Sequence, residues 1–231
     1  MMPTAEHAAP DAPGVLLVLN DVVAAAEEEF NRWYQQEHVA DRLGVPGFRT
    51  ARRYRAVVGQ PKYMAVYECD AIDVFASQAY RERLANPTEW TRKIMPGFRS
   101  MLRSACRETW SAGTGAGGGA IVVQCKPGPG REQAARGFVT DTLAPRLMQP
   151  ACLARMALWE ADAAYTGGPS PEAMLRGGAD KSADWVLFLE SYDLAKTAAA
   201  LVAQLPAGAA GETGLLIDRW SGYQLIYAAT A

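Results

Sequence analysis

The chain has 231 residues, of which 49% are apolar and 21% charged, so it is long enough to bury the core of one or two domains. Its 23 Lys and Arg residues nearly balance 25 Asp and Glu residues, and no basic run stands out, which argues against nucleic acid or an anionic membrane as a partner. No apolar run approaches the ~20 residues that span a membrane, and the N-terminus lacks the pattern of a signal peptide. We therefore expect a cytoplasmic protein.

The cysteines and histidines show none of the spacings that mark a metal or redox site. There is no Cys-x-x-Cys pair, so the four cysteines are expected to be small core residues. His7 lies near the N-terminus, which leaves His38 as the only histidine further along the chain. One histidine cannot form the paired ligands of a typical zinc site, so we predict no metal.

Strand and helix signals alternate in the first half. The continuous apolar run at 15–19 is typical of a strand covered on both faces. Acidic residues at 27–29 indicate a helix start, and this helix should end before Pro46, with Tyr34 and His38 on one face. The first half is expected to contain strands at 15–19, 48–56, 63–69 and 101–110, and helices at 27–45, 72–84 and 86–94.

A shift of 105 residues brings the second half onto the first. Leu16 then falls on Ile121, one apolar strand residue on another, as expected of an internal repeat. The second half is expected to contain strands at 120–125, 153–160, 185–191 and 215–227, and helices at 132–143 and 194–205. The polar cluster of the first helix is lost: Trp33, Tyr34, Glu37 and His38 correspond to Phe138, Val139, Thr142 and Leu143.

Each half thus predicts the order β-α-β-β-α-β of a ferredoxin-like unit in an α+β fold. The glycine-rich segment 112–119 leads into a strand instead of a helix, so it is interpreted as a linker and not as a phosphate-binding loop. Glu68 corresponds to Glu190, an offset of 122 residues instead of 105. The second half therefore has 17 additional residues between its second and third strands, which predicts a long loop at 161–183. The expected organisation is a disordered tail at 1–13, a motif-bearing repeat at 14–111, the linker at 112–119, and a degenerate repeat at 120–231.

These tandem units, with the string Trp33-Tyr34-x-x-Glu37-His38, then Pro46-Gly47-Phe48 and Arg52-Arg53-Tyr54, resemble the dimeric α/β-barrel superfamily, and most closely its EthD-like and related uncharacterised bacterial proteins. The resemblance implies that the two antiparallel sheets pack face to face as a pseudo-dimeric barrel with helices outside. It also implies a homodimer, and a small-molecule site that this chain would carry only in its first half.

His38 is the strongest candidate for chemistry, because a histidine can move protons near neutral pH. The alternative is a histidine that only packs and hydrogen-bonds a neighbour. Arg52 and Arg53 should point to opposite faces of one strand, and an internal ion pair with Glu68 or Glu37 is the competing explanation for either. We predict His38, Tyr34 and Arg53 as catalytic residues, and Trp33, Glu37, Arg52, Tyr54, Tyr67 and Trp90 as substrate-binding residues.

The resemblance implies a small-molecule enzyme or binder that acts on a hydrophobic, oxygenated compound, aromatic or polyketide-like, by acid–base chemistry without a cofactor. A lyase, an isomerase and a monooxygenase are the activities that would fit. The alternative is a non-catalytic ligand-binding or assembly module. A third reading, haem binding through His38, has no other feature of the sequence in its favour.

Overall fold

The computed structural model describes residues 12–148, 153–166, 171–177, 180–205 and 213–231. Most of the tail predicted at 1–13 lies outside these residues.

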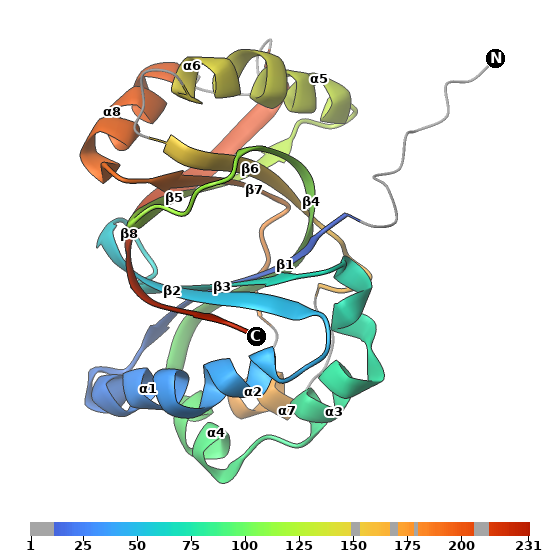
Figure 1. Ribbon diagram of the computed structural model, residues 1–231, viewed down its shortest axis with the longest axis vertical. Coiled ribbons are helices and arrows are strands. Elements are labelled where there is room, and N and C mark those ends of the chain that lie inside the picture. The colour runs from blue at the N-terminus through green and yellow to red at the C-terminus, as the bar shows by residue number, and fades with distance from the viewer. Residues whose placement is uncertain (1–11, 149–152, 167–170, 178–179, 206–212) are drawn as a thin grey trace, which may run out of the picture.

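Eight antiparallel strands form a closed barrel, flanked by helices (Figure 1). The predicted α+β class is confirmed, and the barrel order is β1-β3-β2-β8-β5-β7-β6-β4. The strands are β1 Gly14–Val22, β2 Phe48–Val58, β3 Tyr63–Cys69, β4 Phe98–Gly113, β5 Gly119–Pro127, β6 Leu153–Ala161, β7 Trp185–Ser191 and β8 Leu215–Thr230.

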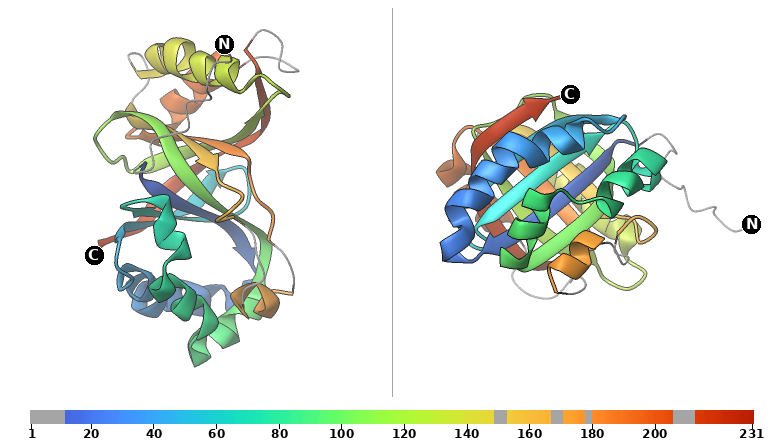
Figure 2. Two further views of the ribbon diagram at one scale, coloured as in Figure 1. Left: turned by 90° about the vertical axis from the view of Figure 1, so that its right-hand side faces the viewer. Right: turned by 90° about the horizontal axis from the view of Figure 1, so that it is seen from below.

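The barrel consists of two four-stranded parts that pair along both edges. One part has the order β4-β1-β3-β2 and comes from the first half of the chain, and the other has the order β8-β5-β7-β6. Hydrogen bonding between β2 and β8 and between β4 and β6 closes the barrel. The side view in Figure 2 shows the barrel strands between two helical layers, one at each end of the molecule.

The apolar run of β1 is buried on both faces. Leu17 and Leu19 belong to the cluster that fills the barrel interior, whereas Leu16 and Val18 belong to the cluster beneath the first-half helices. Because side chains alternate along a strand, coverage of both faces requires the continuous apolar run that the sequence shows.

The helix that carries His38 is continuous but changes geometry in its middle. It begins as α1 (Glu27–Trp33), passes through a π-helical turn at Tyr34–His38, and ends as α2 (Val39–Leu43). The second half has the same arrangement 105 residues later, with a π-helical segment at Phe138–Leu143 between α5 (Glu132–Gly137) and α6 (Ala144–Met148). π-Helical turns occur frequently at functional sites.

The helix predicted at 72–84 is divided. A 3₁₀ segment at Ile72–Ala76 comes first, and α3 (Gln78–Ala85) follows, because the Ser77 hydroxyl accepts a hydrogen bond from the Tyr80 amide and starts a new helix. The remaining helical elements are 3₁₀ segments at Ala24–Ala26 and Met95–Gly97, α4 (Glu89–Ile94), α7 (Pro171–Leu175) and α8 (Leu194–Gln204).

The insertion at 161–183 crosses from the second half to the first. The Asp162 amide donates to the Ala105 carbonyl at 2.9 Å, and the Lys181 amide donates to the Met101 carbonyl at 3.1 Å, so both ends of the insertion lie along β4. Between them, α7 (orange) lies in the same layer as α2 and α3, as the view from below in Figure 2 also shows. A second-half segment therefore covers part of the first half.

Among the described residues, no helix combines the length and the apolar character needed to cross a bilayer.

Candidate functional site

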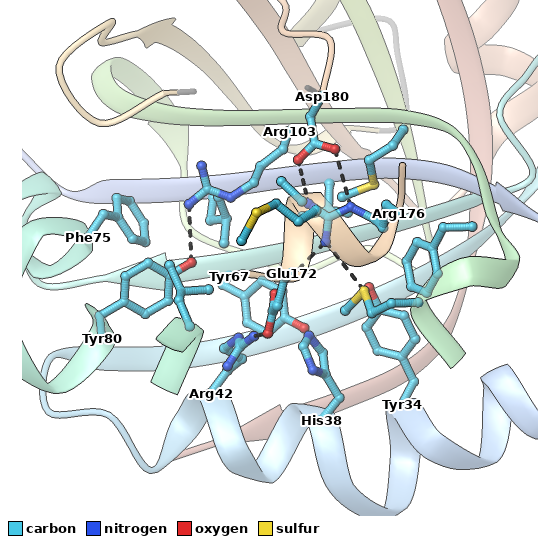
Figure 3. A pocket seen from close by; sticks show the side chains of 18 of the residues that line it. Tyr34, His38, Arg42, Tyr67, Phe75, Tyr80, Arg103, Glu172, Arg176 and Asp180 are labelled. Carbon is cyan, nitrogen blue, oxygen red and sulfur yellow. Dashed lines mark hydrogen bonds and ion pairs between the residues drawn. The ribbon is translucent and has the colours of Figure 1, made fainter. Parts of the chain in front are cut away.

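A cavity of about 570 Å³ lies between the first-half strands and the helices that cover them (Figure 3). Its volume falls within the range of small-molecule pockets. The walls are mostly apolar, with a group of polar side chains among them. Its lining comprises Leu16, Val18, Tyr34, His38, Arg42, Tyr67, Phe75, Tyr80, Leu84, Met95, Phe98, Met101, Arg103, Tyr165, Glu172, Ala173, Met174, Arg176 and Asp180.

The π-helical turn positions the His38 imidazole at the cavity wall. Bonding between residues five apart brings His38 over Trp33, and their rings stack with centroids 4.2 Å apart. Tyr34 meets the imidazole edge-on, at 5.0 Å between centroids. The His38 side chain is 7% exposed, and within the described part of the chain no group forms a hydrogen bond with its ring nitrogens. The imidazole is therefore held by packing, and its nitrogens are available to a ligand.

His38 is electrically neutral in this environment. Burial, followed by the positive charges of Arg42, Arg53 and Arg176, holds the pKa of His38 well below its usual value of 6.5. A neutral imidazole has a nitrogen lone pair that can accept a proton or a hydrogen bond.

Two tyrosine hydroxyls accompany the imidazole. The Tyr67 ring lies 6.4 Å from the His38 ring, and the Tyr67 hydroxyl is buried without a hydrogen-bond partner among the described residues. Burial raises the pKa of Tyr67 well above its usual value and also raises the pKa of Tyr34. Both hydroxyls therefore stay protonated and can donate a hydrogen bond to a ligand oxygen.

Three arginines and two carboxylates also line the cavity. Arg42, one helical turn after His38, forms a buried ion pair with Glu172 of α7, and Arg176 forms one with Asp180 at 2.6 Å. Arg103 of β4 donates to the Tyr80 hydroxyl at 3.1 Å. These contacts are visible in Figure 3.

Arg53 and Arg52 lie on opposite faces of β2, as the alternation of strand side chains predicts, and neither lines the cavity. Arg53 lies behind Tyr34, with its guanidinium carbon 3.9 Å from the centre of that ring, and donates to Asn31 at 3.1 Å. Such a contact is a cation–π interaction. Arg53 can thus affect the cavity through Tyr34 and through its charge.

Arg52 points into the barrel. It forms ion pairs with Glu190 at 2.6 Å and with Glu68 at 2.8 Å, which is the internal pairing that the sequence left open. Tyr54 also belongs to the barrel interior, in the same cluster as Phe188. The sequence indicates that Arg52 and Arg53 point to opposite faces of β2, but it does not indicate which of these faces the helices cover.

The other predicted residues surround the cavity without lining it. Trp33 is fully buried and supports the His38 ring. Glu37 accepts hydrogen bonds from the Trp33 indole at 3.1 Å and from the Thr88 hydroxyl at 2.6 Å, so it joins this helix to the start of α4. Trp90 on α4 is half-buried and packs against the core cluster.

Sequence reasoning missed several polar residues of the cavity: Arg42, Tyr80, Arg103, Glu172, Arg176 and Asp180. Arg42 continues the spacing of four residues that links Tyr34 and His38, so the helical period could have found it. The last three come from the insertion, and nothing in the local sequence indicates that this segment crosses to the other half.

The matching position in the second half is packed. Val139 is fully buried and Leu143 is 1% exposed, and both belong to the apolar cluster between the second-half strands and helices. The polar groups of the first-half cavity are thus replaced by core side chains.

The sequence matches no protein-family model and no curated protein. Its structure is similar to that of an anthrone oxidase-like protein, with 10% identity over 97% of this chain and 95% of the other and a TM-score of 0.63. It is also similar to a proposed monooxygenase from Fusobacterium nucleatum, with 9% identity over 95% and 94% of the two chains and a TM-score of 0.56. A haem-binding protein from Thermus thermophilus has 8% identity over 96% of both chains and a TM-score of 0.56. Together with the closed eight-stranded barrel, these similarities show that the chain has the dimeric α/β-barrel fold.

Proposed function

We propose that the chain is an enzyme of the EthD-like, dimeric α/β-barrel type that converts a hydrophobic, oxygenated compound, aromatic or polyketide-like, by cofactor-free acid–base chemistry. The observation that carries this proposal is the neutral His38 imidazole, which faces a cavity of ligand size beside the buried Tyr67 hydroxyl. A buried polar group without a protein partner costs stability, so such groups are expected where a ligand completes their bonds.

In the proposed reaction His38 acts as a general base. Its imidazole takes a proton from a ligand carbon that is conjugated with a carbonyl group, and the electron pair of the broken C–H bond moves through the conjugated system onto the carbonyl oxygen. The Tyr67 and Tyr34 hydroxyls donate hydrogen bonds to this oxygen as its negative charge develops. The negative charge on this oxygen also offsets the positive charges of the nearby arginines, which otherwise disfavour protonation of the His38 imidazole.

Two proteins of similar structure are named as an anthrone oxidase-like protein and a monooxygenase, and these names favour molecular oxygen as the second reactant. For an anthrone, the deprotonated ring carbon would react with O₂. One oxygen atom would become the new carbonyl oxygen, and the other would leave as water with the two hydrogens lost from carbon. The products, an anthraquinone and one water, balance one anthrone and one O₂.

Anthrone itself is a suitable first probe. Conversion to anthraquinone is followed by absorbance together with oxygen uptake, for the wild type and for His38→Leu, which copies the residue at the matching position of the second half. We expect turnover to fall by at least about 100-fold, as for the loss of a general base. Gln35→Leu, on the same π-helical turn but exposed, is the matched control and should keep wild-type turnover.

The outcomes separate the candidate functions. Turnover that survives in folded His38→Leu would remove His38 from the chemistry. Binding of anthrone in the cavity without any conversion would favour the non-catalytic ligand-binding module. Absence of both binding and conversion would count against this class of ligand.

Haem is the second ligand to consider, because one fold neighbour is a haem-binding protein. A neutral histidine such as His38 can serve as an axial ligand. The cavity fits haem poorly, because Glu172 and Asp180 pair with Arg42 and Arg176, so that among the described cavity residues only Arg103 remains for the two propionates. The proposed reaction therefore involves no haem.

We also propose that the two halves are fused ferredoxin-like repeats, at 14–111 and 120–231. The shared order of elements and the π-helical turns at matching positions support this origin. The homodimer implied by the resemblance is tested by light scattering of the purified protein, where a mass near 24.9 kDa would contradict it.

A further inference from the structure

The described residues that line the cavity include three arginines but only two carboxylates, so the arginines cannot all form ion pairs with cavity carboxylates. Arg42 pairs with Glu172, and Arg176 pairs with Asp180, so both cavity carboxylates are engaged. Arg103 is the remaining arginine among the described cavity residues, and no described carboxylate forms an ion pair with it. Asp180 and Glu172, which pair with the other two arginines, act on Arg103 only through their longer-range charges, which help to raise its pKa. A partly buried guanidinium that forms no ion pair can still gain from a carboxylate partner, since most buried charges are paired.

The position of Arg103 suits the recognition of a ligand. Its side chain extends from β4, and its one described side-chain hydrogen bond goes to the Tyr80 hydroxyl at 3.1 Å. A guanidinium has five N–H donors, so donors remain that can point into the cavity. In Figure 3, Arg103 lies on the same side of the cavity as the rings of Phe75 and Tyr80, whereas His38 projects from the helix at the bottom.

We propose that Arg103 binds a carboxylate carried by the aromatic ligand, so that the substrate of this cavity is an aromatic carboxylic acid. This inference rests on the function proposed above and narrows its substrate class. The planar fork of a guanidinium matches a carboxylate with two parallel hydrogen bonds. Phe75 and Tyr80, whose ring centroids are 5.8 Å apart, provide an apolar surface beside that contact. The carboxylate would hold the ligand at one end while His38 acts on its carbonyl-bearing ring.

The test compares two ligands of nearly the same shape, one carrying an anionic carboxylate and the other a neutral carboxamide. Anthraquinone-2-carboxylate and anthraquinone-2-carboxamide are titrated into the full-length protein by isothermal calorimetry. We expect the wild type to bind the carboxylate about 10- to 100-fold more tightly, as for a charge-assisted bidentate pair. In Arg103→Met this ratio should fall to near one, while affinity for the carboxamide changes little.

Arg99→Met is the matched control, because Arg99 lies on the same strand, is exposed and does not line the cavity. It should keep the wild-type ratio. Should Arg103→Met fail to fold, Arg103→Lys retains the charge without the fork, and the ratio is expected to fall several-fold. The wild-type ratio is informative without any variant.

The two proposals fail in different ways. Equal affinity of the wild type for both ligands would overturn the role of Arg103 and leave the cavity as a ligand site. Loss of both affinities to the same extent in folded Arg103→Met would assign Arg103 a structural role and likewise overturn the inference. If neither anthraquinone nor anthrone binds the wild type, the proposed function fails together with the inference.

Discussion

The Arg42 guanidinium and the Glu172 carboxylate form a buried ion pair between positions 130 residues apart. Their side chains are 4% and 9% exposed. Arg42 belongs to the helix that carries His38, and Glu172 belongs to the insertion of the second half. The pair therefore attaches a second-half helix to the first-half cavity, so one half supplies part of the wall for the other.

Glu172→Gln should destabilise the protein. The substitution removes the main counter-charge of the buried Arg42. Removing one partner of a buried ion pair normally lowers the free energy of unfolding by about 3–5 kcal/mol. Asp41, which also contacts Arg42 at 2.7 Å, retains part of the compensation, so we expect a loss of about 1–3 kcal/mol. Urea denaturation measures this free energy of unfolding. Asp70→Asn removes an exposed ion pair with Arg49 and should cost less than ~1 kcal/mol.

Protonation of His38 should couple stability to pH. Burial and three nearby arginines hold the pKa of His38 well below 6.5, whereas the unfolded chain has the ordinary pKa. Below about pH 6.5 the His38 imidazole therefore binds a proton in the unfolded state but not in the folded state, so the free energy of unfolding falls as pH falls. At most, the loss is about 1.4 kcal/mol for each pH unit below the unfolded pKa.

The measurement is the free energy of unfolding at pH 7.5 and at pH 5.5. Between these values the wild type should lose more stability than His38→Leu, which has no imidazole to protonate. NMR adds an independent check, because the His38 ring signals should not titrate near pH 6.5. Equal pH dependence of the two proteins would show that His38 titrates normally in the fold.

The sequence predicted the strands more accurately than the helices. The bounds of β3 and β7 agree with the prediction, because apolar runs bounded by turn residues mark buried strands well. The prediction at 72–84 was wrong in its continuity, since a local side-chain cap at Ser77 overrides the helical pattern. The π-helical turns were not predicted, because an i to i+5 bond leaves no periodic signature in a short segment.

The candidate site was predictable only as far as local periodicity reaches. The helical face indicated Tyr34 and His38, and both line the cavity. Arg52 was placed near the substrate, but it lies in the barrel with Glu190, because alternation cannot identify the inward face. Glu172 reaches the cavity because α7 crosses from the second half to the first, which only the three-dimensional structure reveals.

Tyr67→Phe and Tyr54→Phe form a matched pair of substitutions. Both hydroxyls are buried and lack hydrogen-bond partners among the described residues, but Tyr67 lines the cavity and Tyr54 lies inside the barrel. Removing either hydroxyl should leave stability unchanged or slightly higher, because an unsatisfied polar group is lost. Only Tyr67→Phe should lower anthrone turnover, by about 10²–10³-fold, as for an oxyanion donor.

Steady-state assays of the two tyrosine variants, with thermal melts, decide this prediction. Equal turnover of both would exclude Tyr67 as the donor to the developing oxyanion. A loss of turnover in Tyr54→Phe would place the reaction inside the barrel, where Tyr54 lies.

Leu143→His tests the asymmetry between the halves from the opposite direction to His38→Leu. The new imidazole would replace a leucine that is 1% exposed in an apolar cluster, without the cavity that His38 faces. It would lose apolar contacts and leave ring nitrogens unsatisfied, so we expect a cost of about 2–4 kcal/mol. His38→Leu removes a group that no described residue hydrogen-bonds, and its stability should change by less than about 2 kcal/mol. Urea denaturation of both variants measures the change in the free energy of unfolding. Similar losses for the two substitutions would mean that His38 contributes as much to the stability of the first half as Leu143 does to that of the second.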